Sequence, residues 1–131
     1  MVYTPAMPRR RFTPEQANRT LPLVRPIAAD ILAAGKELRA LADPAPEGAV
    51  ESLRDRIRDL IGELESIGCS WRDWNFEAGL VDYPARIEGR TVLLCWRSDE
   101  QAITWYHTPE GGFAGRQPIP PDLLEPRSGG A

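Results

Sequence analysis

The side chain best suited to acid–base or metal chemistry is the single histidine of the sequence, His107. Glu110 follows it three residues later, and Glu15 lies near the start of the first predicted helix. These residues could let His107 act as a base or ligate a metal ion. A zinc or iron site needs three or four converging ligands, however, and the spacing of the sequence does not assemble such a set. We therefore predict no cofactor, with a divalent metal at His107 as the less favoured alternative.

A glycine-rich stretch, residues 111–116 (GGFAGR), could bind an anion through its backbone N–H groups. Arg116 and Arg97 would supply the charged partners. Three prolines follow Gln117 closely, so the helix that follows a phosphate-binding loop cannot form here. The favoured interpretation is a turn that brings Phe113 into the core.

The two cysteines, Cys69 and Cys95, form no C-x-x-C pair. Asp82 is the expected cross-strand neighbour of Cys95, and a nearby carboxylate disfavours a thiolate. We predict a buried thiol rather than a nucleophile, and a reduced cytoplasmic protein. No catalytic residue is assigned, and the binding candidates are His107, Glu110, Arg116, Arg97, Asp82 and Glu15.

Residues 12–68 have the pattern of two helices. Thr13 to Gln16 form a capping box that starts the first helix, and apolar residues then recur every three or four positions. Pro22 and Pro26 lie inside this stripe, and each costs about 3 kcal/mol in an isolated helix. We expect one kinked helix, with a split into two helices as the alternative. Residues 49–67 carry a heptad seam, which predicts an antiparallel, coiled-coil-like hairpin whose seam is buried internally or against a second copy.

Residues 69–118 change to a period of two, which predicts three or four antiparallel strands in a meander. A tight turn at Glu88-Gly89 would pair Ile87 with Arg90. A second turn at residues 98–101 would pair Arg97 with Ala102. This register places His107 on the face that packs against the helices, and a slip of one residue would reverse that placement.

The sequence of 131 residues predicts one α+β domain, with flexible arms at residues 1–11 and 119–131. Its net charge of −3 argues against nucleic acid. The longest apolar stretch, residues 21–34, is interrupted by charges and prolines, so no membrane span is predicted. The N-terminal stretch lacks the apolar region of a signal peptide, and we expect a cytoplasmic location.

Five motifs, at residues 12–22 (FTPEQANRTLP), 79–85 (GLVDYPA), 94–97 (LCWR), 105–107 (WYH) and 112–118 (GFAGRQP), resemble those of an uncharacterised bacterial family, domain of unknown function 2203. The resemblance runs from Phe12 to about Ile119. It implies a small cytoplasmic protein with an N-terminal helical pair and a C-terminal sheet, and it lends no settled activity. The matching motif residues are Glu15, Asn18, Asp82, Cys95, Trp96, Glu100, His107, Gly115 and Arg116.

A heptad seam and an aromatic-rich sheet without a convergent catalytic set favour a non-catalytic protein-interaction module. We expect it to form a homodimer or to bind another protein. The alternative is a small metal- or anion-binding protein, or an enzyme, with its site around His107 and Arg116. Enzymatic activity is the less favoured of these interpretations.

Overall fold

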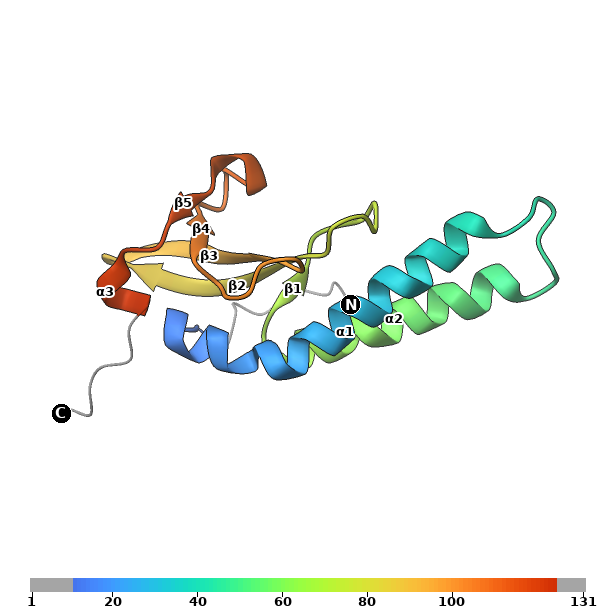
Figure 1. Ribbon diagram of the computed structural model, residues 1–131, viewed down its shortest axis with the longest axis horizontal. Coiled ribbons are helices and arrows are strands. Elements are labelled where there is room, and N and C mark those ends of the chain that lie inside the picture. Colours follow the sequence, from blue (N-terminus) through green and yellow to red (C-terminus); the bar gives the residue numbers. More distant parts are fainter. Residues whose placement is uncertain (1–10, 125–131) are drawn as a thin grey trace, which may run out of the picture.

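The computed structural model describes residues 11–124 as a helical pair packed on one face of an antiparallel sheet, which confirms the predicted α+β fold (Figure 1). The sheet has five strands in the order β1-β2-β3-β4-β5. The helices are α1 (Pro14–Ala40), α2 (Ala49–Ile67) and the short α3 (Pro121–Leu124). The strands are β1 (Ser70–Trp71), β2 (Leu80–Ile87), β3 (Arg90–Arg97), β4 (Trp105–His107) and β5 (Gln117–Pro118), with a 3-10 turn, η1 (Phe113–Gly115), before the last.

Helix α1 runs unbroken through Pro22 and Pro26, as the phase of its apolar stripe predicted. It begins with the predicted capping box, in which Thr13 and Gln16 exchange two hydrogen bonds. The cost of the two prolines is offset by burial of one face of the helix against the sheet. No helix within residues 11–124 is long and apolar enough to cross a membrane.

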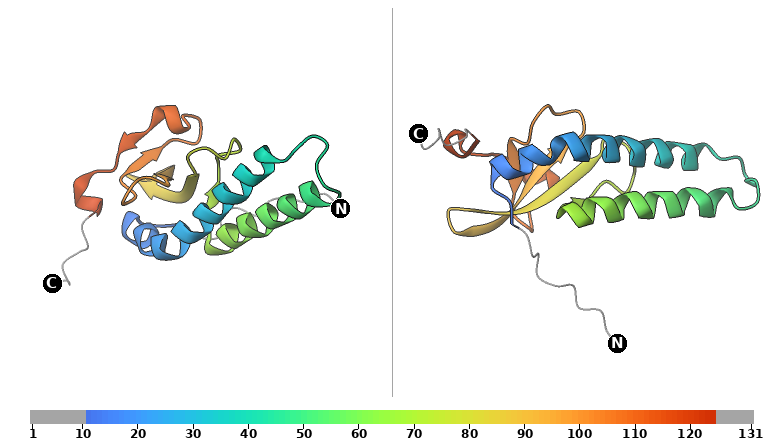
Figure 2. Two further views of the ribbon diagram at one scale, coloured as in Figure 1. Left: turned by 45° about the vertical axis from the view of Figure 1, so that its right-hand side comes forward. Right: turned by 90° about the horizontal axis from the view of Figure 1, so that it is seen from below.

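The core lies between the helical pair and the sheet. Its largest fully buried side chains include Ile31, Leu64, Tyr83, Leu94 and Trp96. The sheet covers only one end of the helical pair, and the C-terminal part of α1 projects beyond it with the N-terminal part of α2 (Figures 1 and 2). In that projecting part, the apolar seams of the two helices pack against each other.

The β2–β3 hairpin has the predicted register, with Ile87 opposite Arg90 and Asp82 opposite Cys95. Its two-residue turn has positive φ at both positions, 52° at Glu88 and 77° at Gly89. These angles are those of a type I′ turn, whose twist matches that of the flanking strands.

The predicted β3–β4 register is wrong by one residue. Cys95 lies opposite Trp105 and Leu93 lies opposite His107, so His107 is on the face away from the helices. The cause is a contact from α1: the Asn18 side chain accepts the Ile103 N–H at 2.8 Å and donates to the Ile103 carbonyl at 3.1 Å. Ile103 therefore bonds to the helix rather than to β3, and β4 begins only at Trp105.

The chain remains ordered beyond the predicted boundary at residue 119. Ile119 is buried, and its N–H donates to the Thr104 carbonyl at 2.9 Å. Helix α3 follows and contacts α1. The predicted arm thus does not begin at residue 119, because Ile119 has a place in the core. The rest of that arm, and residues 1–10 of the other, lie outside the described residues.

Candidate metal centre

Three potential metal ligands converge on the sheet face away from the helices: Asp82 on β2, Cys95 on β3 and His107 on β4. The register explains why they meet, since Asp82 is directly opposite Cys95 and His107 lies on the same face of the next strand. One ligand atom from each lies within 4.8 Å of the others. All three side chains are buried, and within residues 11–124 they form the one group of this kind.

The hydrogen bonds of His107 leave its second ring nitrogen facing an acceptor. Nδ1 lies 2.7 Å from the Thr108 carbonyl oxygen, which can only accept, so Nδ1 carries a proton. Nε2 lies 3.1 Å from Oδ2 of Asp82. In a neutral imidazole, Nε2 then presents a lone pair to a carboxylate. A second ring proton, a proton on Asp82 or a metal cation between these two atoms would satisfy both of them. An Nδ1–H bond to a backbone carbonyl is also the usual support of a metal-bound histidine.

Asp82 Oδ2 also has a cationic neighbour, Arg72, whose Nε lies 3.3 Å away. The Asp82 side chain is 5% exposed, whereas that of Arg72 is 52% exposed. The carboxylate is thus buried at the base of the site, while the guanidinium lies at its solvent edge. A buried carboxylate needs such positive neighbours, because an isolated buried charge is costly.

The thiol of Cys95 is held in its neutral form in the metal-free site. Burial, followed by the charge of Asp82, raises its pKa to about 12. Cys95 is buried, as predicted. A bound cation would change that state, because a coordinating thiol loses its proton.

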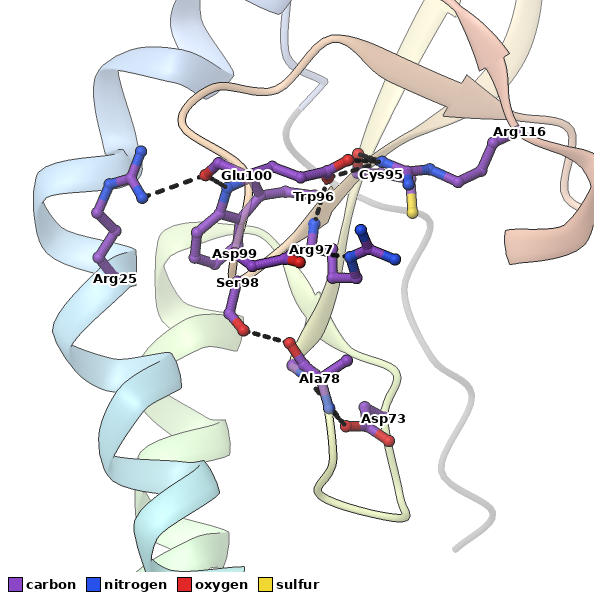
Figure 3. Close-up of polar contacts among 11 residues, drawn as sticks. Arg25, Asp73, Ala78, Cys95, Trp96, Arg97, Ser98, Asp99, Glu100 and Arg116 are labelled. Atoms are coloured by element: carbon purple, nitrogen blue, oxygen red, sulfur yellow. Dashed lines mark hydrogen bonds and ion pairs between the residues drawn. The ribbon is translucent and has the colours of Figure 1, made fainter.

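A polar network holds the backbone of Cys95 in place (Figure 3). The Glu100 carboxylate accepts from Nη2 of Arg116 at 2.7 and 2.8 Å and from the Arg97 N–H at 2.7 Å. Nη2 of Arg116 also donates to the Cys95 carbonyl at 3.2 Å. The turn after β3 is tied to α1 as well, since Arg25 donates to the Glu100 carbonyl. These contacts fix the strand end from which the thiol projects.

Residues 108–116 cover this face of the sheet as a third layer (Figure 1). The Arg116 guanidinium lies 5.0 Å from the Trp105 ring centre and 4.7 Å from that of Phe113. Phe113 is 40% exposed, so the prediction that it enters the core is wrong. Its ring contacts arginines instead because the core face of the sheet is already occupied by the helices.

A cavity of about 250 Å³ lies between this layer and the three ligands. Arg72 and Phe113 form part of its wall. The complete lining is Arg72, Leu80, Asp82, Leu93, Cys95, His107, Pro109, Gly112 and Phe113. The candidate ligands are therefore buried and also reachable from one side.

The structure brings some predicted binding residues together and separates others. Asp82 and His107 meet at the candidate metal centre. Arg116 lies in the network behind Cys95. Arg97 donates its backbone N–H to this network, while its guanidinium pairs with Asp99 and lies 5.8 Å from the Phe113 ring centre. The other two lie elsewhere: Glu15 pairs with Arg19 on α1, and Glu110 is exposed on the covering loop.

Cys95 and Arg72 were missed as site residues. The signal for Cys95 was present in its predicted pairing with Asp82, but the wrong β3–β4 register placed His107 on the opposite face. Arg72 lies in the short segment after β1 and reaches Asp82 only through the pairing of β1 with β2. No local pattern in the sequence indicates that contact.

Residues 10–119 match the family described as uncharacterized conserved protein (DUF2203), and the chain belongs to this family. Neither the comparison with curated proteins nor that with solved structures gives a match. The description of the family names no activity.

Proposed function

We propose that the protein binds one divalent metal ion, Zn²⁺, through Asp82, Cys95 and Nε2 of His107. The observation that supports this most directly is the convergence of three different ligand types within 4.8 Å on three adjacent strands. The 3.1 Å approach of Nε2 to Asp82 Oδ2 is a second support, because one cation could bind two ligand atoms at this spacing.

The donor set suits zinc, which takes thiolate, imidazole and carboxylate ligands. With bond lengths of about 2.0–2.3 Å, ligand atoms of a tetrahedral zinc site lie about 3.3–3.8 Å apart. The Nε2–Oδ2 distance is 3.1 Å, and every distance between the three ligand atoms is 4.8 Å or less. Small movements of the side chains would thus complete the geometry. We place the protein in the cytoplasm, where the two unpaired, buried cysteines stay reduced.

Replacement of Cys95 by alanine tests this proposal. We expect the wild-type protein to take up one Co²⁺ or Zn²⁺ per chain and to show the thiolate-to-cobalt charge-transfer band. Cys95→Ala should lose that band and bind the metal at least tenfold more weakly, because it removes one of three ligands. Elemental analysis and absorption spectroscopy during a Co²⁺ titration would measure both effects.

Cys69→Ala is the matched control, since Cys69 is also buried and burial raises the pKa of its thiol to about 12. This variant should bind metal like the wild type. Wild-type protein that takes up no stoichiometric metal, or Cys95→Ala with an unchanged cobalt spectrum, would refute the proposal. Loss of metal binding in His107→Ala, measured in the same way, would identify His107 as a second ligand.

A second candidate function, self-association, rests on an apolar groove on the helical pair. It is lined by Leu38, Arg54, Ile57, Arg58, Ile61, Glu65, Trp74 and Phe76, and Trp74 is 63% exposed. We propose a second copy as its occupant, because α2 has Arg54 and Arg58 toward one end of the groove and Glu65 toward the other. A two-fold axis would place these arginines opposite Glu65 of the other copy.

Light scattering over a concentration series tests self-association. In the wild type, the average mass should rise above the monomer mass of 14.6 kDa as concentration increases. In Trp74→Ala, it should remain at the monomer mass. Leu23→Ala is the matched control, because Leu23 is 64% exposed on the N-terminal half of α1 and does not line the groove. A wild type that remains monomeric at all concentrations would remove this candidate.

A further inference from the structure

We infer that the metal centre binds a small carboxylate ligand, which would coordinate the ion at its open position and pair with Arg72. This inference rests on the proposed metal site and specifies its ligand class. Three protein ligands leave a tetrahedral ion with one position for an exogenous group, as in catalytic rather than structural zinc sites.

The cavity supplies a place for that group. It measures about 250 Å³ and opens at the three proposed ligands. Drug-sized ligands occupy pockets of about 300–1,000 Å³, so this cavity suits a smaller molecule. A fourth ligand would reach the ion from the cavity, because all three proposed protein ligands line it.

With the divalent ion bound, the charge of the cavity would favour an anion. Among the described residues, Arg72 is the cationic side chain that lines the cavity. Its ion pair with Asp82 uses Nε. Its terminal nitrogens can therefore meet a carboxylate, which guanidinium groups bind in a bidentate manner. In the metal-bound site, the Asp82 carboxylate and the Cys95 thiolate would each carry a negative charge. The divalent ion and Arg72 together would exceed that charge, so the site could accept one further anion.

The remaining lining is largely apolar, with Leu80, Leu93, Pro109 and Phe113. Phe113 is held at the rim by its contacts with Arg116 and Arg97. An apolar body attached to the carboxylate would pack against these side chains. This combination favours a carboxylic acid with a small apolar group over inorganic phosphate, which has no apolar part.

Benzoate added to Co²⁺-loaded protein is the test. The visible cobalt bands should change in a saturable way, whereas benzamide, the neutral analogue, should leave them unchanged. Arg72→Leu should weaken benzoate binding at least tenfold, while Arg90→Leu, an exposed arginine at the start of β3, should not change it. Phe113→Ala should weaken benzoate binding but not acetate binding, because acetate has no ring to contact Phe113.

The outcomes separate this inference from the proposed function. Cobalt bands that do not respond to benzoate, or that respond equally in Arg72→Leu, would refute the carboxylate ligand and leave the metal site standing. A larger response to phosphate than to benzoate would also refute it. Absence of the cobalt bands before any anion is added would overturn both.

Discussion

Replacement of Asp73 by alanine is expected to lower the free energy of unfolding by about 4 kcal/mol, because one buried carboxylate organises the whole loop between β1 and β2. Its Oδ2 accepts the N–H groups of Glu77, Ala78 and Gly79 at 2.7, 2.8 and 3.0 Å. Its Oδ1 accepts that of Asn75 at 3.2 Å. Alanine would leave four backbone donors without this acceptor. Urea unfolding followed by tryptophan fluorescence would measure the loss.

Asp73→Asn should be milder than alanine, at about 2 kcal/mol, because its amide oxygen still accepts while its amino group cannot. Asp99→Ala is the surface control. Asp99 is 65% exposed and pairs with Arg97, so its loss should cost less than about 1 kcal/mol. Equal effects of Asp73→Ala and Asp99→Ala would contradict the role assigned to Asp73.

Acid should weaken the same contribution. Burial tends to raise the pKa of Asp73, but the four N–H groups outweigh burial and lower it below its ordinary value of 3.8. A carboxylate with a lowered folded-state pKa stabilises the protein above its unfolded-state pKa and loses this effect as pH falls through the folded-state value. The stability difference between wild type and Asp73→Asn should therefore shrink below about pH 4.

Gly35→Ala is expected to destabilise the protein by about 2 kcal/mol, although alanine is the better helix former. A Cβ atom at Gly35 would lie 2.5 Å from Cβ of Phe76. Phe76 cannot move away easily, because Arg39 of α1 donates to its backbone carbonyl at 3.2 Å and its φ angle is 56°. The loop that Asp73 organises is thus packed directly on α1 at this glycine.

Gly62→Ala is the matched control for this substitution. Gly62 lies within α2, and a Cβ atom there would meet no atom within 4 Å. We expect Gly62→Ala to stabilise the protein by about 1 kcal/mol through helix propensity alone. The two alanine variants should therefore shift the urea midpoint in opposite directions. A stabilised Gly35→Ala would show that Phe76 does not pack as described.

The elements of this fold could be predicted because their signals are local. The capping box at Thr13 and the two-residue turn at Glu88-Gly89 lie within a few residues of the structures they start. The change of apolar period after Gly68 marks the step from helix to sheet. Local backbone preferences and one-sided burial are sufficient for such features, and long-range contacts do not alter them.

The site could be predicted only in part. The pairing of Asp82 with Cys95 followed from the tight turn, since a two-residue turn sets the register of its hairpin. The next connection is longer, and its length does not set a register. Its conformation depends on Asn18, 85 residues earlier in the chain, and on the Glu100–Arg116 ion pair.

The sequence by itself therefore determined the helices, the hairpin and two of the three proposed ligands as neighbours. The tertiary structure decided that His107 joins them. A shift of one residue in a β register moves every side chain to the other face of the sheet, so the contact between Asn18 and Ile103 sets the face on which the histidine lies. That choice depends on a helix meeting a distant loop, which no local pattern encodes.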